Sequence, residues 1–143
     1  MIDISNISNN QQQTIAKPVS IKGIGLHTGA EVTMKLYPAK VDYGIKFIRN
    51  DIKDNNVIEA LWSNVSSTKL STTISNQNGT SVSTIEHLMS ALSGLHIDNI
   101  KIEIDGPEVP IMDGSSIKFV DLINQTSIQS LNKKRKILKV KKN

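Results

Sequence analysis

Alternating apolar and polar residues mark a series of short strands along the chain. The alternation runs through residues 14–24 and 31–37, and it is cleanest over 97–105, where isoleucines occupy every second position from residue 100. A period of two is typical of a strand with one buried face. The first two segments flank the glycine-punctuated turn 23–29, so we expect them to pair as a hairpin. Shorter strand candidates lie at 45–49, 57–65 and 70–74.

Two segments carry apolar residues at helical spacing instead. The tetrapeptide STIE at 83–86 has the order of a capping box, the apolar residues after it recur every three or four positions, and Gly94 is placed to end the helix. A second helix is predicted from about residue 116 to residue 124. Several strands and two helices without a regular β-α-β alternation indicate an α+β fold, in which a mostly antiparallel sheet carries both helices on one face.

The chain is predicted to contain one main domain and a piece of a second. Residues 1–13 are polar, aperiodic and rich in Asn, Gln and Ser, so we expect a disordered leader there. Residues 14–126 hold the strong periodic segments and are long enough to bury a core. The pattern fades afterwards, and residues 127–143 are interpreted as a linker and the truncated start of a second domain, with 137–140 as a strand candidate.

The composition excludes several classes of protein. Hydrophobic residues make up 38% of the 143 residues and charged residues 21%, which fits a globular protein, and the absence of cysteine excludes disulfides and thiolate zinc clusters. No apolar run approaches the roughly 18 residues of a membrane span, and the N-terminus lacks the features of a signal peptide. With five aromatic residues in all, a stacking-based binder of single-stranded nucleic acid is not expected.

The net charge of +4 belongs to the end of the sequence rather than to the whole chain. Residues 133–143 contain seven of the seventeen Lys and Arg residues and no acidic residue, so the rest of the chain carries a net charge of −3. The main domain therefore shows no footprint of a nucleic-acid partner. The basic run has three interpretations that the residues leave open: a surface for nucleic acid or anionic lipid, a solvated end, or a strand whose partner lies elsewhere.

Glu86 and His87 are the residues whose types and positions suggest chemistry. Adjacent side chains do not share one face of a helix, but in its first turn both can lean toward a cleft beyond the N-terminus. A histidine there could give a neutral nitrogen to zinc while the glutamate takes a proton from zinc-bound water. The alternative is structural, because a capping box also places Glu at residue 86, and no H-E-x-x-H motif is present.

The other histidines and a group of acidic residues have simpler interpretations. His27 lies in the GIGLHTG turn, whose glycine spacing does not fit a dinucleotide-binding loop, and we expect a surface or hydrogen-bonding role. His96 follows the first predicted helix, where a protonated imidazole favours the helix dipole. Asp105, Glu108 and Asp113 are predicted to act as caps and turn formers in the proline-rich connection before the second helix.

Four stretches, in their order and spacing, resemble the N-terminal half of a known enzyme family. That family comprises the bacterial zinc deacetylases that act on UDP-3-O-acyl-N-acetylglucosamine in lipid A biosynthesis. The resemblance covers about residues 13–143. The stretches that carry it are IKGIGLHTG (21–29), LSTTI (70–74), VSTIEHLMSALSGLHIDN (82–99) and IEIDGPEVPIMDGSS (102–116).

This resemblance implies a fold, a reaction and roles for four residues. Members of the family have two α+β domains with the active site between them. As cytoplasmic zinc-dependent amide hydrolases they remove the N-acetyl group of UDP-3-O-(3-hydroxyacyl)-N-acetylglucosamine. Glu86 matches the family's general base, and His87 matches the zinc ligand that the first domain supplies. Lys69 and Leu70 match a region that meets the substrate near the catalytic cleft.

The sequence holds only part of the site that the resemblance implies. The family's other two zinc ligands form an H-x-x-x-D motif in the second domain, and no histidine of this chain is followed by Asp at that spacing. A catalytic zinc site normally has three protein ligands, so one of the three ligands of a Zn2+ cofactor would be present here. The acid that protonates the leaving amine is a further histidine of the second domain.

Three hypotheses therefore remain open. In the first, the chain is the N-terminal part of the deacetylase, is inactive alone, and is completed by a separate polypeptide that carries the second domain. In the second, it is a truncated remnant without activity. In the third, it is a non-catalytic interaction module that uses its exposed sheet and its basic C-terminal tail. The partners in the first hypothesis are the UDP-linked acylated glucosamine and the second polypeptide, with no nucleic acid.

Overall fold

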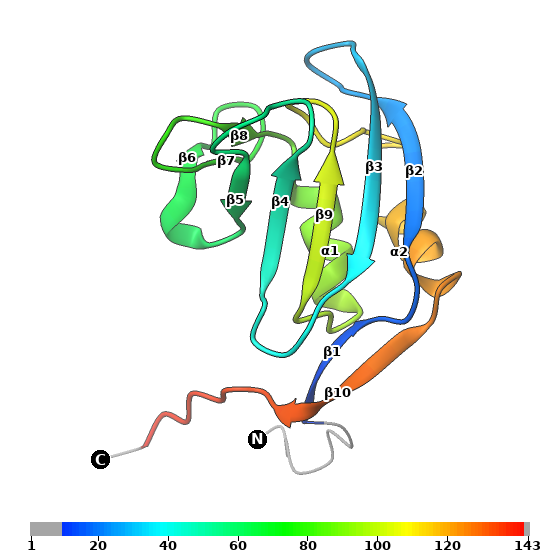
Figure 1. Ribbon diagram of the computed structural model, residues 1–143, viewed down its shortest axis with the longest axis vertical. Coiled ribbons are helices and arrows are strands. Elements are labelled where there is room, and N and C mark those ends of the chain that lie inside the picture. The colour runs from blue at the N-terminus through cyan, green and yellow to red at the C-terminus, as the bar shows by residue number, and fades with distance from the viewer. Residues whose placement is uncertain (1–9, 142–143) are drawn as a thin grey trace.

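The computed structural model describes residues 10–141, and a five-stranded sheet forms its centre (Figure 1). From one edge to the other, the strands are β2 (Val19–Ile24), β3 (Glu31–Pro38), β9 (Ile100–Ile104), β4 (Ile45–Arg49) and β5 (Val57–Glu59). Neighbouring strands are antiparallel except for the parallel pair β4 and β9. β2 pairs with β3 along its whole length, which confirms the predicted hairpin.

Two helices, α1 (Glu86–Gly94) and α2 (Ile117–Asn124), cover one face of this sheet (Figure 1). The alternation in β9 explains why: Ile100, Ile102 and Ile104 are fully buried, whereas Lys101 and Glu103 alternate with them and form an ion pair. The helices add the buried side chains of Leu88, Ala91, Leu92, Phe119, Leu122 and Ile123. The α+β prediction is therefore confirmed. Within residues 10–141, no helix has the length and apolar content needed to cross a membrane.

A second, smaller sheet follows β5 in the chain and lies beside it (Figure 1). It contains β6 (Val65–Ser67), β7 (Thr73–Ser75) and β8 (Ser81–Val82). A 3-10 turn at Trp62–Asn64 interrupts the strand predicted over 57–65. The strand predicted over 70–74 begins late, at Thr73, because Leu70 has a left-handed backbone with φ of 65°.

An antiparallel ribbon of β1 (Gln11–Ile15) and β10 (Ile128–Lys134) brings together the two ends of the described chain (Figure 1). Three predictions are wrong here. The leader predicted over 1–13 includes strand residues 11–13, and its residues 1–9 lie outside the described part. The strand predicted over 14–24 is broken at 16–18, and 137–140 is not a strand. The domain boundary predicted after residue 126 falls just before β10 and stays a prediction.

Polar side chains explain why β1 has no apolar signature. Gln12 is buried, and its Oε1 accepts a hydrogen bond from Asn99 Nδ2 at 2.9 Å and another from the N–H of Asp42 at 2.9 Å. An inward-facing amide with partners is as compatible with burial as an apolar side chain, but it leaves no hydrophobic period. Pro18 has no N–H for a sheet ladder, and the chain leaves β1 before it and joins the main sheet after it.

Candidate functional site

Glu86 and His87 are the first two residues of α1, and both side chains are half-buried. The predicted capping box is wrong, because Ile85 precedes the helix in a helical conformation and no side chain caps it. Ser83, the expected cap, donates its backbone N–H and its hydroxyl to the carbonyl oxygen of Pro107, at 2.9 and 3.3 Å. Tertiary contacts replace the local cap, which leaves the Glu86 carboxylate to contact another part of the chain.

The Glu86 carboxylate contacts the loop that precedes β7. Its Oε2 accepts the N–H of Thr72 at 3.1 Å, and the carbonyl oxygen of Thr72 accepts the N–H of Ile85 at 3.3 Å. Oε1 of Glu86 has no hydrogen-bond partner within the part of the chain that the structure describes. One oxygen is thus anchored by the loop, and the other is available to take a proton.

Lys69 and Leu70 lie in the same loop as Thr72. Both side chains are exposed, Leu70 to 82%, and the N–H of Lys69 donates to Ser67 Oγ at 3.2 Å. Because Thr72 joins this loop to Glu86, the structure brings the loop and the first turn of α1 together. Contact of Lys69 and Leu70 with a substrate stays a prediction.

Glu108, which the sequence predicts as a cap or turn former, has a larger role in the structure. It is 1% exposed; its Oε1 accepts the His27 N–H at 3.0 Å and the Thr84 hydroxyl at 2.8 Å, and its Oε2 accepts the Thr28 N–H at 2.9 Å. It therefore joins the GIGLHTG turn to the residue two positions before Glu86. Burial raises the pKa of Glu108, but the N–H groups of His27 and Thr28 and the Thr84 hydroxyl outweigh it, so its pKa lies below the ordinary value.

Of the two neighbouring acidic residues, Asp113 has the local role predicted for it, whereas Asp105 contacts β3, far away in the sequence. Asp105 Oδ1 accepts the N–H of Thr33 at 2.7 Å, and Asp113 Oδ1 accepts the N–H of Ser115 at 3.0 Å. The His27 side chain is exposed, as expected for a turn residue. One feature of the sequence could have indicated that Glu108 is buried: it lies among Pro107, Val109 and Pro110, an apolar surrounding for an acidic residue. A buried acidic residue needs partners, which indicates a hydrogen-bonding role in the folded chain.

Residues 10–141 contain no group of three or more His, Asp or Glu side chains placed to hold a metal ion. His87 is therefore a single candidate ligand rather than part of an assembled centre. Since a catalytic zinc site normally takes three protein ligands, these residues alone do not fit one. A zinc site that includes His87 would take its other ligands from outside the described residues.

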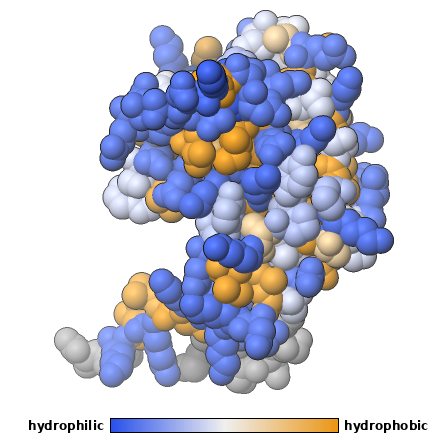
Figure 2. Space-filling model, in the orientation of Figure 1, coloured by the Kyte–Doolittle hydropathy of each residue, from blue (hydrophilic) through white to orange (hydrophobic). Residues whose placement is uncertain are grey.

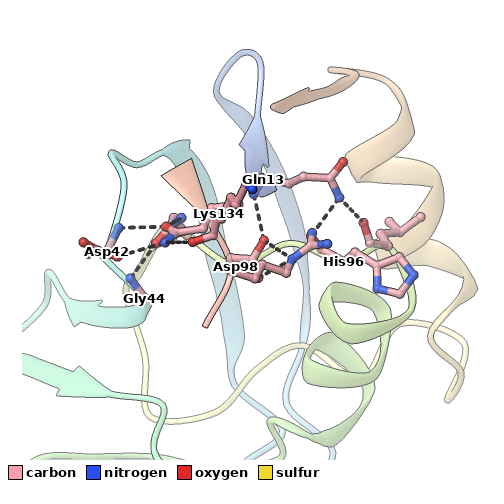
Figure 3. A network of polar contacts seen from close by, with 10 residues as sticks. Gln13, Asp42, Gly44, His96, Asp98 and Lys134 are labelled. Carbon is pink, nitrogen blue, oxygen red and sulfur yellow. Dashed lines mark hydrogen bonds and ion pairs between the residues drawn. The ribbon is translucent and has the colours of Figure 1, made fainter. Parts of the chain in front are cut away.

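The opposite end of α1 is organised by a polar network around Asp98 (Figure 3). Asp98 Oδ2 accepts the N–H of Gln13 at 2.7 Å, and both of its oxygens accept Nε–H of Arg135 at 2.9 Å. Gln13 Nε2 and Arg135 Nη2 each donate to the carbonyl oxygen of His96 at 2.9 Å. The network therefore holds β1 and the residue after β10 against the end of α1.

A hollow of about 720 Å³ opens beside this network. Residues around it include Ile45, Met89, Ser93, Ile97, Asp98 and Arg135. Lys69, Leu70, Glu86 and His87 are not among its lining residues. The candidate chemistry and this hollow therefore belong to different surfaces of the molecule.

Comparison with known proteins gives one consistent result. A family model described as LpxC, UDP-3-O-acyl N-acetylglycosamine deacetylase, matches residues 12–143. The UDP-3-O-acyl-N-acetylglucosamine deacetylases of Syntrophotalea carbinolica and Geotalea uraniireducens are 51% and 53% identical over 131 residues, and that of Myxococcus xanthus is 44% identical over 135. These alignments cover 92–94% of this chain but only 42–43% of the relatives. The chain belongs to the UDP-3-O-acyl N-acetylglycosamine deacetylase family, and it spans less than half the length of these relatives.

Proposed function

We propose that this chain is the N-terminal part of a zinc-dependent, cytoplasmic hydrolase that removes the N-acetyl group from UDP-3-O-(3-hydroxyacyl)-N-acetylglucosamine in lipid A biosynthesis. The relatives are named for deacetylation of UDP-3-O-acyl-N-acetylglucosamine. The observation that carries the proposal is the Glu86–His87 pair at the start of α1, inside the matched region, with Glu86 anchored at one oxygen.

Glu86 acts as the general base in this proposal. Its Oε2 accepts the Thr72 N–H, which helps to orient the carboxylate, while Oε1 has no hydrogen-bond partner within the described chain. A positioned carboxylate of this kind takes the proton of the attacking water as the new C–O bond forms. Lys69 and Leu70, exposed on the adjoining loop, contact the substrate in this proposal.

In this proposal His87 supplies one zinc ligand, and the remaining ligands come from a second domain outside residues 1–143. Zinc bound there would polarise the acetamide carbonyl and lower the pKa of a bound water. The acid that protonates the leaving amine is also outside the chain, since an amide nitrogen leaves poorly without a proton. In this proposal residues 1–143 contribute a base, one ligand and a substrate-facing loop, and a second domain completes the site.

The decisive experiment measures deacetylation by this chain before and after adding the missing part. We expect the purified chain alone to release no acetate and to bind no stoichiometric zinc. Addition of the C-terminal portion of the Geotalea uraniireducens relative should create activity. That activity should be lost in Glu86→Ala and retained in Asp54→Ala, which removes an exposed acid with no assigned role.

Two results would overturn the proposal. Tight one-to-one zinc binding by the chain alone, abolished by His87→Ala, would show that a complete centre exists without a second domain. A stable complex with the C-terminal portion that never releases acetate would favour an inactive remnant.

A second candidate function rests on the end of the described chain. Ile137, Leu138 and Val140 are 59%, 93% and 85% exposed, and they alternate with lysines along a segment without regular structure. Figure 2 shows apolar and hydrophilic residues together along this extended segment, at the lower left of the view. Such a segment could serve an interaction module. Binding of the C-terminal portion that depends on residues 136–141, without any deacetylation, would favour that function.

A further inference from the structure

Glu108 is a buried carboxylate that has no role in the reaction proposed above. Its bonds cross long stretches of sequence: the His27 and Thr28 N–H groups donate from the GIGLHTG turn, and the Thr84 hydroxyl donates from the segment that precedes α1. Since burying an ionised carboxylate is costly unless it is fully hydrogen-bonded, three donors on one side chain indicate a position that the fold maintains.

The segment that carries Glu108 fits closely against the GIGLHTG turn. The N–H of Ile111 donates to the carbonyl oxygen of Ile24 at 2.9 Å. A Cβ at Gly25 would lie 2.4 Å from Glu108 Oε2, so only glycine allows the carboxylate to approach the turn at this point. The GIGLHTG turn and the 105–116 connection therefore pack closely against each other around the Glu108 carboxylate.

Besides the turn, Glu108 contacts a strained residue in the segment that precedes α1. Thr84 has φ of 55°, a left-handed conformation that is unfavourable for a β-branched side chain. Its hydroxyl donates to Glu108 Oε1 at 2.8 Å, and the neighbouring Ser83 carbonyl accepts the N–H of Val109 at 3.0 Å. The chain enters α1 directly after this turn, so the direction of the first helical turn depends on how Thr84 is held.

We propose that Glu108 is a positioning residue, which locks the GIGLHTG turn and the strained Thr84 to one carboxylate and thereby fixes where Glu86 and His87 project. This inference rests on the proposed function for its effect on catalysis, but not for the coupling between the two segments. Glu108 itself touches no reacting group. Its effect passes through Thr84 and Ile85 to the first turn of α1.

The coupling can be tested on the chain itself by amide hydrogen exchange. Thr84→Val keeps the β-branched shape and removes the hydroxyl, whereas Thr84→Ser keeps the hydroxyl. We expect Thr84→Val to speed exchange of the His27 and Thr28 amides about tenfold, although they lie in another segment, and Thr84→Ser to leave them near the wild-type rate. Asp105→Asn is the matched control, because Asp105 also accepts a backbone N–H but from Thr33 in β3. Its effect should stay at Thr33.

The catalytic consequence is measured in the complex with the C-terminal portion, at a temperature where every variant is folded. Glu108→Gln and Thr84→Val should lower kcat about 10- to 100-fold with little change in KM, since small misplacements of reacting groups cost that much. Thr84→Ser should retain the rate. If Glu108→Gln does not fold, the pair of Thr84 variants still decides the question.

Each outcome bears on one proposal. Unchanged exchange at His27 and Thr28 in Thr84→Val would show that the two segments are not coupled, and an unchanged kcat per folded molecule would show that the coupling does not position the site. Either result overturns the role of Glu108. Absence of activity in the wild-type complex, with the expected exchange pattern, would instead overturn the proposed function and leave the coupling standing.

Discussion

The N-terminal end of α1 lies near two loops that are held by the carboxylates of Glu86 and Glu108, whereas its C-terminal end lies against the β1–β10 ribbon, which is held by Asp98 and Arg135. Glu86 and Glu108 each reach one loop at the first end, and the anchored Glu86 keeps one oxygen without a partner in the described chain. At the second end, Asp98 uses both oxygens to hold β1 and Arg135. At the N-terminal end one carboxylate oxygen is thus available for chemistry, whereas at the C-terminal end both oxygens of Asp98 already accept hydrogen bonds.

The candidate site residues Glu86 and His87 therefore lie at the opposite end of α1 from the Asp98 network that holds the β1–β10 ribbon. The hollow of about 720 Å³ lies at the C-terminal end of α1 and includes Asp98 and Arg135 among its lining residues. The carboxylate of Asp98 at that end already accepts hydrogen bonds from Gln13 and Arg135. The two ends should therefore respond oppositely to substitution, one in rate and the other in stability.

The largest effect is expected for Glu86→Gln in the complex with the C-terminal portion. The amide oxygen can still accept the Thr72 N–H, but the group no longer takes a proton, so kcat should fall about 10²- to 10⁴-fold while KM and the unfolding midpoint barely change. Steady-state kinetics with acetate release and thermal unfolding of the same samples give both values. A loss of stability comparable to the loss of rate would remove the distinction between the two ends.

Asp98→Ala should show the reverse pattern. The substitution removes the acceptor of the Gln13 N–H and of the Nε–H of Arg135, whose side chain is 20% exposed. We expect a loss of about 2–3 kcal/mol in the free energy of unfolding, measured by urea denaturation, because a hydrogen bond to a charged group is lost at each partner. The kcat per folded molecule in the complex should stay the same. A fall in kcat without a fall in stability would assign Asp98 to the site.

Glu108 should give the N-terminal end a measurable dependence on acid. Its pKa is lower in the folded chain than its ordinary value, so the ionised form favours folding. This contribution is complete above the ordinary Glu pKa of about 4.3 and is lost as the pH falls through the folded-state pKa. Glu108→Gln should cost about 1–2 kcal/mol near pH 7, and the gap between the two proteins should close at low pH.

The comparison uses urea denaturation of both proteins across the acidic range. Other carboxylates with lowered pKa, such as Asp51 beside Arg49 and Glu103 beside Lys101, titrate in both proteins and cancel in the difference. A gap that stays constant down to the lowest pH would mean that the cost of the substitution is one of shape rather than charge.

The parts of the fold that the sequence predicts are those with a one-sided apolar pattern. Strand β9 and helix α1 bury one face each, and the period survives in the sequence because polar residues stand opposite. The β1 strand of the ribbon could not be predicted from the sequence pattern, because Gln12 is buried through hydrogen bonds rather than through apolar contacts. Hydrogen bonds of this kind depend on partners far along the chain, which no local pattern reveals.

The same limit applies to the candidate site. Glu86 and His87 could be identified from local sequence and resemblance, since both belong to one motif at the start of a helix. Glu108 could not, because its donors are 81, 80 and 24 residues away and meet it only in the folded chain. The prediction of a capping box was wrong for a related reason: Ser83 and Glu86 form hydrogen bonds with Pro107 and Thr72 instead of with each other.

The smallest effect is expected for Lys133→Ala, on the same ribbon as the Asp98 network. Lys133 pairs with Asp42, and their side chains are 51% and 44% exposed, compared with 20% and 28% for Arg135 and Asp98. Water and salt screen such an exposed pair, so the urea midpoint should not shift measurably, and any shift should vanish at about 1 M salt. The pKa of Asp42 is lowered chiefly by the hydrogen bond from Lys133 and then by Gln12, so in the variant it should rise part of the way toward its ordinary value. NMR titration of Asp42 measures this directly. A clear loss of stability would mean that the ribbon is held along its whole length and not only at Asp98.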